Sequence, residues 1–141
     1  MTAGDSVAAA DVDISLHHVH LMAADLSSSV AFWTDNFAAQ VVADLEFSGS
    51  RNVFLKVGDG RVHLYDQPPN HRGPVNHVGV LVADIDSVST RMRTLGCSIR
   101  PVKSDPNTGT RYCMVEGPDG VLIELFQIGQ EGGRHDHYFV D

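Results

Sequence analysis

Apolar and polar positions alternate along several short segments of the chain, and two of these segments resemble each other. One reads His-Val-His-Leu-Met-Ala-Ala-Asp-Leu from His18, and the other reads His-Val-Gly-Val-Leu-Val-Ala-Asp-Ile from His77. They lie 59 residues apart. Each is a short apolar run that ends at an aspartate, Asp25 or Asp84, and aspartate is a preferred helix cap. The pattern predicts a strand followed by a helix, twice.

The residues after each aspartate have helical spacing. Apolar side chains recur on one helical face in both halves, at Val30, Trp33 and Phe37 and at Val88, Met92 and Leu95. Gly96 follows the second set, where a glycine commonly ends a helix. We therefore expect two equivalent helices.

Further strand-like runs complete each half of the chain. They are Gln40–Glu46, Asn52–Val57 and Arg61–Tyr65, and then Ser98–Val102, Arg111–Val115 and Val121–Phe126. Glycine-containing turns join the last two runs of each half. The order is βαβββ, twice. This order predicts an α+β fold of two βαβββ modules that form a cup-shaped, partly open mixed β-barrel with flanking helices.

The two halves are expected to form one domain over residues 14–129. We place the modules at 14–67 and 75–129, joined by a linker at 68–74 that is rich in proline and glycine. A half of this size could hardly bury its own sheet, so the halves should pack together. Residues 1–13 and 130–141 are predicted to be flexible tails.

Composition narrows the class of protein. The net charge of −8 makes the chain a poor candidate for nucleic-acid binding. No apolar run is long enough to span a membrane, and the first residues lack the basic region of a signal peptide. Cys97 and Cys113 form no C-x-x-C motif, which favours a reduced pair over a disulfide. We therefore expect a cytoplasmic protein.

Four polar residues interrupt otherwise apolar strands. His18 and His77 begin the repeated strands, while His63 and Glu124 each interrupt a later apolar run. A carboxylate in such a run is costly unless it is paired or binds a cation. Side chains alternate across a strand, so we expect all four groups on the inner surface of one curved sheet. Imidazole and carboxylate together suit Zn, Ni, Co, Mn or Fe.

The first repeated strand carries two more histidines. His20 shares a face with His18, whereas His17 should share the opposite face with Val19 and Leu21. The helix should cover the more apolar face, which leaves His18 and His20 on the concave side. We interpret His20 as a pocket residue rather than a ligand.

Plainer interpretations compete with a metal site. A lone histidine in a strand is most often a core or rim residue, and Glu124 could pair with Arg111 instead of a cation. His135 and His137 have metal-like spacing, but we interpret them as part of an exposed tail. The repeat relation between His18 and His77, together with Glu124, favours a metal.

A family resemblance agrees with this interpretation. The matching segments are His18 with Asp25-Leu26 and Phe32-Trp33, then Phe54-Leu55-Lys56-Val57-Gly58 with His63-Leu64, then His77 with Asp84-Ile85, and finally Pro118-Asp119-Gly120-Val121-Leu122-Ile123-Glu124-Leu125. In this order and spacing the chain resembles the vicinal oxygen chelate superfamily over about residues 14–128. That superfamily includes glyoxalase I, methylmalonyl-CoA epimerase, extradiol dioxygenases and fosfomycin-resistance and bleomycin-resistance proteins.

The resemblance implies one divalent transition metal per chain. In the glyoxalase and epimerase branches the first and fourth strands of each module supply the ligands, which here correspond to His18, His63, His77 and Glu124. The ligand at the position of His63 is often glutamate or glutamine, so His63 departs from the common pattern. A slip of one residue would turn His63 outward. The fosfomycin-resistance and dioxygenase branches use two histidines and one carboxylate. The resemblance also implies a homodimer.

The shared chemistry implied by the resemblance is chelation of a small substrate through two neighbouring oxygens. Four protein ligands would favour a lyase or isomerase that acts through a metal-stabilised enolate or enediolate. Glu46 resembles in placement the base of the epimerase branch. Glu124 could instead serve as the base, as in the glyoxalase branch.

Two alternatives remain open. Two histidines and one carboxylate suit an Fe(II)-dependent extradiol-type dioxygenase, in which His63 would act beside the metal. A metal-free drug-binding protein of the bleomycin-resistance type is the other alternative, although such proteins lack the ligand set found here. Six residues are candidates for contact with a small-molecule substrate: His20, Arg51, Tyr65, Arg111, Tyr112 and Phe126.

Overall fold

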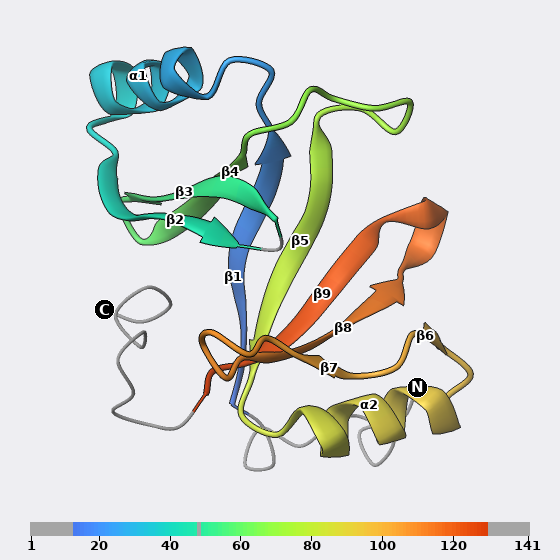
Figure 1. Ribbon diagram of the computed structural model, residues 1–141. Coiled ribbons are helices and arrows are strands. Elements are labelled where there is room, and N and C mark those ends of the chain that lie inside the picture. Colours follow the sequence, from blue (N-terminus) through green and yellow to red (C-terminus); the bar gives the residue numbers. More distant parts are fainter. Residues whose placement is uncertain (1–12, 48, 130–141) are drawn as a thin grey trace.

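The computed structural model of the protein describes residues 13–47 and 49–129 (Figure 1). Its elements follow in the order β1 (Ile14–Met22), α1 (Leu26–Phe37), β2 (Gln40–Phe47), β3 (Ser50–Val57), β4 (Gly60–Tyr65), β5 (Val75–Val82), α2 (Ile85–Thr94), β6 (Ser98–Ile99), β7 (Lys103–Ser104), β8 (Arg111–Glu116), the short 3-10 helix η2 (Pro118–Gly120) and β9 (Leu122–Gln127). The two predicted βαβββ modules are confirmed. The predicted C-terminal tail, with His135 and His137, lies outside the described residues.

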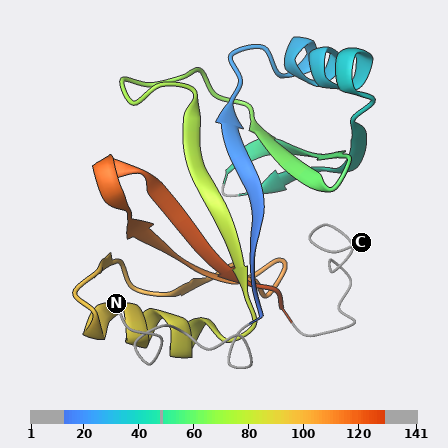
Figure 2. The ribbon, with the colours of Figure 1, turned by 180° about the vertical axis from the view of Figure 1, so that it is seen from behind.

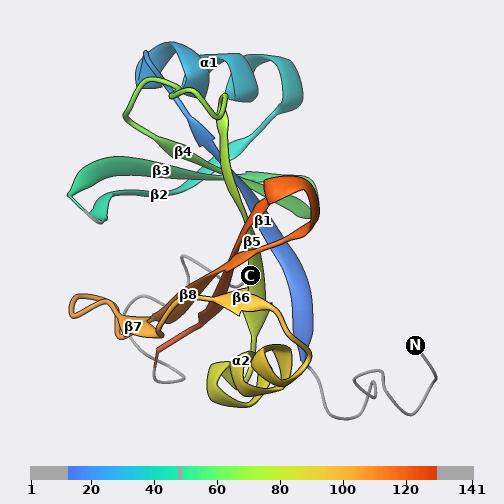
Figure 3. The same cartoon turned by 90° about the vertical axis from the view of Figure 1, so that its right-hand side faces the viewer.

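The strands form one curled mixed sheet in the order β2-β3-β4-β1-β5-β9-β8-β6, with β7 paired to β8. The long strands β1 and β5 pair antiparallel and join the modules edge to edge. Each also pairs in parallel with the last strand of its own module, β1 with β4 and β5 with β9. In Figure 3, β2–β3 and β7–β8 extend to the same side of the β1–β5 pair, which gives a half-barrel. The predicted cup is confirmed.

The two helices start in the same way. The side chain of Asp25 accepts a hydrogen bond from the backbone N–H of Ser28, and Asp84 accepts one from Ser87, each at 3.1 Å. Such caps satisfy backbone donors that the first helical turn leaves open. Both caps thus follow the 59-residue repeat.

Two apolar clusters cover the outer face of the sheet, one in each module. Val30 and Trp33 of α1 pack on a cluster that includes Leu55 and Leu64. In the second module, α2 packs on a cluster of Val82, Ile85, Cys113, Val115 and Leu125. Figure 2 shows the helices at opposite ends of the molecule. The helices cover the apolar face of the sheet, so the polar residues of the same strands face the concave side.

One prediction about the elements is wrong in detail. Of the predicted strand Ser98–Val102 only β6 forms, and β7 begins beyond it at Lys103. Pro101 has no N–H for a strand ladder. Phe37 shares a helical face with Trp33, as predicted, with ring centroids 5.4 Å apart, although it is 52% exposed at the end of α1. Leu95 caps α2 and is 59% exposed.

The helices are short. α1 has 12 residues and α2 has 10, and no helix in the described ranges is long and apolar enough to cross a membrane.

Candidate metal centre in the cup

Strand alternation brings polar side chains from both modules to the concave side. His20 lies opposite His63 in the β1–β4 ladder and opposite His77 in the β1–β5 ladder. Glu124 lies beside Gly79 in the β5–β9 ladder. The site is therefore assembled within one chain, at the seam between the modules.

A cavity of about 230 Å³ opens at this seam. Its lining comes from both modules: His18, His20, Phe47, Asn52, Phe54, His63, Tyr65, Asn76, His77, Thr110, Tyr112, Met114, Glu124 and Phe126. Phenylalanine and tyrosine rings line the cavity together with four histidines, Asn52, Asn76, Thr110 and Glu124. This combination is typical of a small-molecule site.

Nε2 of His77 lies near two other candidate ligand atoms. It is 3.4 Å from Nε2 of His18 and 3.7 Å from Oε1 of Glu124. Two ligands at about 2.1 Å from a tetrahedral ion are themselves about 3.4 Å apart, so each of these spacings suits a pair of ligands. Among the described residues, His18, His20 and His77 place ligand atoms within 4.8 Å of one another, whereas Glu124 is not in such a group and would have to move toward His18 to share an ion with it.

Burial keeps the imidazoles neutral. Desolvation, with the charges of neighbouring histidines, lowers the pKa of His18 to about 2 and that of His77 to about 3. Burial also lowers the pKa of His20 to about 4 and that of His63 well below its usual value. A neutral imidazole has a free ring lone pair, which is the form that binds metals.

Burial shifts the pKa of Glu124 in the opposite direction. It raises the pKa of the carboxyl to about 7, so the charged form destabilises the fold when no cation is bound. Its contact with His77 is not an ion pair of two full charges, because His77 stays neutral. Arg111 does not supply the charge either, since its guanidinium forms a bidentate pair with Asp86 at 2.7 and 2.9 Å. A bound cation would remove the cost.

His63 faces inward, as predicted, but its ring is stacked. It lies between Phe54 and His18, with ring centroids 3.7 Å from each and interplanar angles of 11° and 15°. Ring lone pairs lie in the ring plane, so stacked rings cannot both point at one ion. His63 can join His18 as a ligand only after its ring turns.

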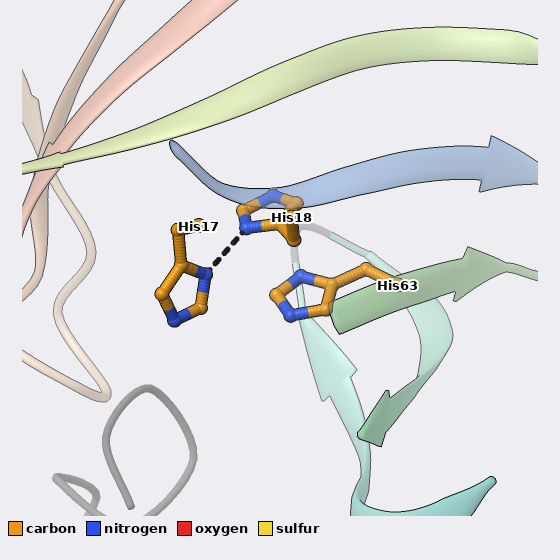
Figure 4. Close-up of side chains that lie close together, drawn as sticks. All are labelled: His17, His18 and His63. Carbon is orange, nitrogen blue, oxygen red and sulfur yellow. Dashed lines mark hydrogen bonds between the residues drawn. The ribbon is translucent and has the colours of Figure 1, made fainter. Parts of the chain in front are cut away.

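The interpretation of His17 was wrong. It was expected on the outer face with Val19 and Leu21, but its side chain is buried beside His18 (Figure 4). Its ring also contacts Phe126 edge-on, with centroids 4.9 Å apart. A β-bulge is the reason. Leu16 and His18 pair with the consecutive residues Val80 and Gly79, so His17 is the extra residue and the alternation breaks there.

His17, His18 and His63 lie close together, as Figure 4 shows, and their ring nitrogens fall within 4.8 Å of one another. They do not form a second metal site in this arrangement. The rings of His18 and His63 are parallel, so their lone pairs do not converge. The close contact is instead a hydrogen bond between the Nδ1 atoms of His17 and His18 at 2.8 Å.

The residues predicted to contact substrate divide into two groups. His20, Tyr65, Tyr112 and Phe126 line the cavity. Arg51, Arg111 and Glu46 do not: each lies outside the lining residues, and Arg51 pairs with Asp44 at 2.8 Å. On β2 the inward position is taken by Phe47, and Glu46 is exposed beside it. The structure does not bring Glu46 to the metal-binding end.

Several lining residues were missed by the sequence reasoning: Phe47, Asn52, Phe54, Asn76 and Thr110. Alternation within β3 would have found Asn52 and Phe54, because they share a face two residues apart. Asn76 is the counterpart of His17 in the repeat, and because His17 was assigned to the outer face, the repeat would have placed Asn76 there as well.

The donor set in the cup fits a divalent transition metal. Within the described ranges, the buried Nε2 atoms of His20 and His63 have no hydrogen-bond partner. Buried polar atoms in native proteins are nearly always satisfied. Neutral imidazoles, one carboxylate and spare nitrogen donors match the preferences of Zn, Ni, Co, Mn or Fe.

Comparison with known proteins supports the same assignment of fold. The chain is 26% identical over 123 residues to the uncharacterized protein YwkD of Bacillus subtilis, covering 80% of this chain and 96% of that protein. Methylmalonyl-CoA epimerase from Mycobacterium tuberculosis superposes with a TM-score of 0.72 at 23% identity, over 92% of this chain and 97% of that one.

A Streptomyces coelicolor methylmalonyl-CoA epimerase variant in complex with 2-nitronate-propionyl-CoA has a TM-score of 0.69 at 20% identity, over 82% of this chain and 97% of that one. The family model described as Glyoxalase/Bleomycin resistance protein/Dioxygenase superfamily matches residues 15–125. The match spans β1 through most of β9 and so covers both modules. The chain therefore belongs to the glyoxalase/bleomycin resistance protein/dioxygenase superfamily, the vicinal oxygen chelate proteins.

Proposed function

We propose that the protein is a divalent-metal-dependent lyase or isomerase of the glyoxalase and epimerase type. Its small oxygenated substrate would pass through an enolate or enediolate. One observation carries the proposal: Nε2 of His77 lies within 4 Å of a ligand atom of both His18 and Glu124, so groups from both modules gather in the cavity.

His18, His77 and Glu124 would hold the ion, and His63 would complete the set once its ring leaves the stack with His18 and Phe54. When bound, a divalent cation neutralises negative charge that develops on neighbouring oxygens of a chelated substrate. Glu46 has no part in this proposal, because it lies outside the cavity lining.

The residues of the chain would control protons and water. Glu124, with its pKa raised to about 7, can hold or release a proton at a carboxyl oxygen near neutral pH. The unpartnered Nε2 of His20 faces the same cavity and can hydrogen-bond a substrate oxygen. Phe54, Tyr112 and Phe126 line the walls and limit the entry of water, which strengthens these polar contacts.

The cavity favours a compact substrate. Its volume of about 230 Å³ suits a small acyl or carbonyl group, and Tyr65 and Tyr112 line the walls. The described lining contains no lysine or arginine, so nothing within it favours a phosphate group. We therefore propose that recognition rests on two neighbouring oxygens and a short apolar body.

A second candidate function is supported by the stacking of His63. If His63 stays between Phe54 and His18, the ion would have only two histidines and one carboxylate. This ligand set with open positions is typical of non-haem Fe(II) oxygenases. An extradiol-type dioxygenase is then the alternative.

One experiment separates the two functions. The protein is loaded with Zn, Ni, Co, Mn or Fe(II), and each form is assayed with 2-oxoaldehyde–thiol adducts, 2-substituted acyl thioesters and catechols. A lyase or isomerase should catalyse exchange of the substrate α-proton with deuterium from solvent and consume no oxygen. Oxygen uptake with a catechol, only in the Fe(II) form, would establish the dioxygenase instead. A protein that binds metal but acts on none of the three classes would contradict both assignments.

We also expect a homodimer in the cytoplasm. Apolar residues are exposed outside the cup, including Leu16, Phe32 and Val41, and a partner subunit could cover them. A sedimentation experiment at micromolar concentration should give twice the chain mass, and a monomer would contradict the expectation.

A further inference from the structure

In both modules the residue before the histidine ligand forms a hydrogen bond with its Nδ1. Nδ1 of His17 lies 2.8 Å from Nδ1 of His18, and Oδ1 of Asn76 lies 2.6 Å from Nδ1 of His77. His17 and Asn76 are related by the same 59-residue offset as His18 and His77. Two different side chains therefore make the same contact at equivalent positions.

The contact in the second module has a definite direction. An amide oxygen can only accept a hydrogen bond, so His77 must donate from Nδ1–H. A neutral imidazole has a single N–H, which leaves the lone pair on Nε2. This is the atom of His77 that lies near both His18 and Glu124.

The contact in the first module can run either way, because each ring of a neutral histidine pair can donate. The two directions of this hydrogen bond differ in which ring nitrogen of His18 keeps its lone pair. If His18 donates from Nδ1, its lone pair is on Nε2, which points toward His77. If His17 donated instead, the lone pair of His18 would face His17, and Nε2 would present a hydrogen to the site.

We propose that His17 and Asn76 are positioning residues that hold His18 and His77 in the Nδ1–H tautomer and so direct both Nε2 lone pairs at one cation. The tautomer of His77 follows from its contact with Asn76 alone, whereas the tautomer of His18 and the identity of the bound group as a metal rest on the function proposed above. Metal-binding histidines generally donate their other ring N–H to a fixed acceptor, which sets both tautomer and orientation.

The fold contains a specific feature for this role. The β-bulge makes His17 the extra residue of β1 and turns its ring inward, where Phe126 packs against it at an interplanar angle of 80°. The rings of His17 and His18 are perpendicular, at 89°. The same irregularity recurs in the second module, where the consecutive residues His20 and Leu21 pair with His77 and Val75, so Asn76 is the extra residue of β5. Asn76 also lines the cavity, and its amide reaches Nδ1 of His77. Each bulge thus brings the residue before the histidine to the Nδ1 atom of its neighbour.

Two pairs of variants test the proposal. His17→Phe keeps a ring against Phe126 but removes the acceptor, and His17→Asn restores an acceptor of the kind found in the second module. Asn76→Leu removes the acceptor there, and Asn76→Asp keeps it. Long-range nitrogen–proton NMR spectra, recorded without metal and with Zn²⁺, report the tautomer of each histidine, and titration with Co²⁺ reports metal affinity.

In the wild type, His77 should be the Nδ1–H tautomer without metal, and His18 and His77 should both be Nδ1–H tautomers with Zn²⁺ bound. His17→Phe should change the tautomer of His18 alone, Asn76→Leu that of His77 alone, and each should lower Co²⁺ affinity by about 10- to 100-fold. His17→Asn and Asn76→Asp should restore both readings. An unchanged His18 tautomer in His17→Phe, or equal loss of affinity in His17→Phe and His17→Asn, would overturn the proposal. Wild-type protein with the expected His77 tautomer but no affinity for Zn²⁺ or Co²⁺ would instead overturn the metal function.

Discussion

Gly79 lies directly opposite His18 in the β1–β5 ladder, and the His18 ring occupies the space that a side chain at position 79 would fill. A Cβ atom added to Gly79 would fall 2.5 Å from both ring nitrogens of His18 and closer still to Cε1. By the repeat, Gly79 is the counterpart of His20. At these equivalent positions the first module has His20, whereas the second has Gly79, whose missing side chain leaves room for the His18 ring.

Gly79→Ala should therefore displace the His18 ring. Overpacking of this kind typically costs about 1–3 kcal/mol of stability, and a shift of the ligand should weaken Co²⁺ binding by at least about tenfold. The measurements are urea unfolding and metal titration. Gly60→Ala is the matched control, because a Cβ there meets its nearest neighbour at an ordinary 3.5 Å. Equal metal affinity in the two variants would contradict this account of Gly79.

Glu124→Gln should separate stability from metal binding. Burial raises the pKa of Glu124 from 4.5 to about 7, so the ionised group destabilises the metal-free fold increasingly as pH rises from 4.5 to 7, and constantly above it. Each pKa unit corresponds to about 1.4 kcal/mol, so the metal-free variant should gain on the order of 2–3 kcal/mol at pH 8 and little at pH 4.5.

Urea unfolding in the presence of a chelator at several pH values measures this difference. The exposed Glu116 offers a control, and Glu116→Gln should change the stability of the metal-free protein by less than about 0.5 kcal/mol. A variant at Glu124 that is less stable than the wild type at pH 8 would show that the carboxylate has a protein partner.

The metal-free protein should lose stability on acidification. The pKa of His18, His20 and His77 is lowered from 6.5 by burial, so below pH 6.5 the unfolded chain binds protons that the folded chain does not. Each histidine then costs about 1.4 kcal/mol per pH unit. Glu124 acts in the opposite sense between pH 4.5 and 7, but one carboxyl cannot offset three imidazoles.

Urea unfolding between pH 7.5 and 5 checks this slope. His20→Gln should make the dependence of stability on pH shallower by the contribution of about one proton. Burial lowers the pKa of His20 from 6.5 to about 4, so between these pH values the unfolded wild type binds a proton at His20 that the folded wild type does not, and the variant lacks this difference. A stability that is independent of pH in this range would mean that the histidines are not buried in the neutral form.

The repeat made most of the fold predictable. The two capping aspartates and the glycine turns are local signals, and strand alternation holds outside β-bulges such as that at His17. The candidate metal-binding residues His18, His77 and Glu124 were also accessible, since each is a polar residue in an apolar strand. The break near Pro101 had a local signal that the strand pattern overlooked, whereas the exposure of Phe37 depends on the position of the helix end in the fold.

Three aspects of the site could not be predicted. The bulge at His17 inserts one residue into β1, and no sequence period signals it. The stacking of His63 depends on Phe54 across the β3–β4 ladder, a contact set by pairing register. Glu46 was placed by analogy of position, but the inward position at that strand end is occupied by Phe47.

Glu46→Gln should consequently leave metal binding unaltered. Its side chain is exposed and is separate from the residues that line the cavity. Surface substitutions of this kind usually change stability by less than about 0.5 kcal/mol. Co²⁺ titration should give the wild-type stoichiometry and an affinity unchanged within error. A large loss of affinity would place Glu46 nearer the ion than the structure does.

Metal analysis of the purified protein tests the central claim most directly. The account predicts one divalent transition-metal ion per chain in the wild type, near-complete loss of the ion in His77→Ala and Glu124→Gln, and partial loss in His63→Ala. Wild-type protein that holds no metal and binds none on addition, or Glu124→Gln with full occupancy, would contradict it.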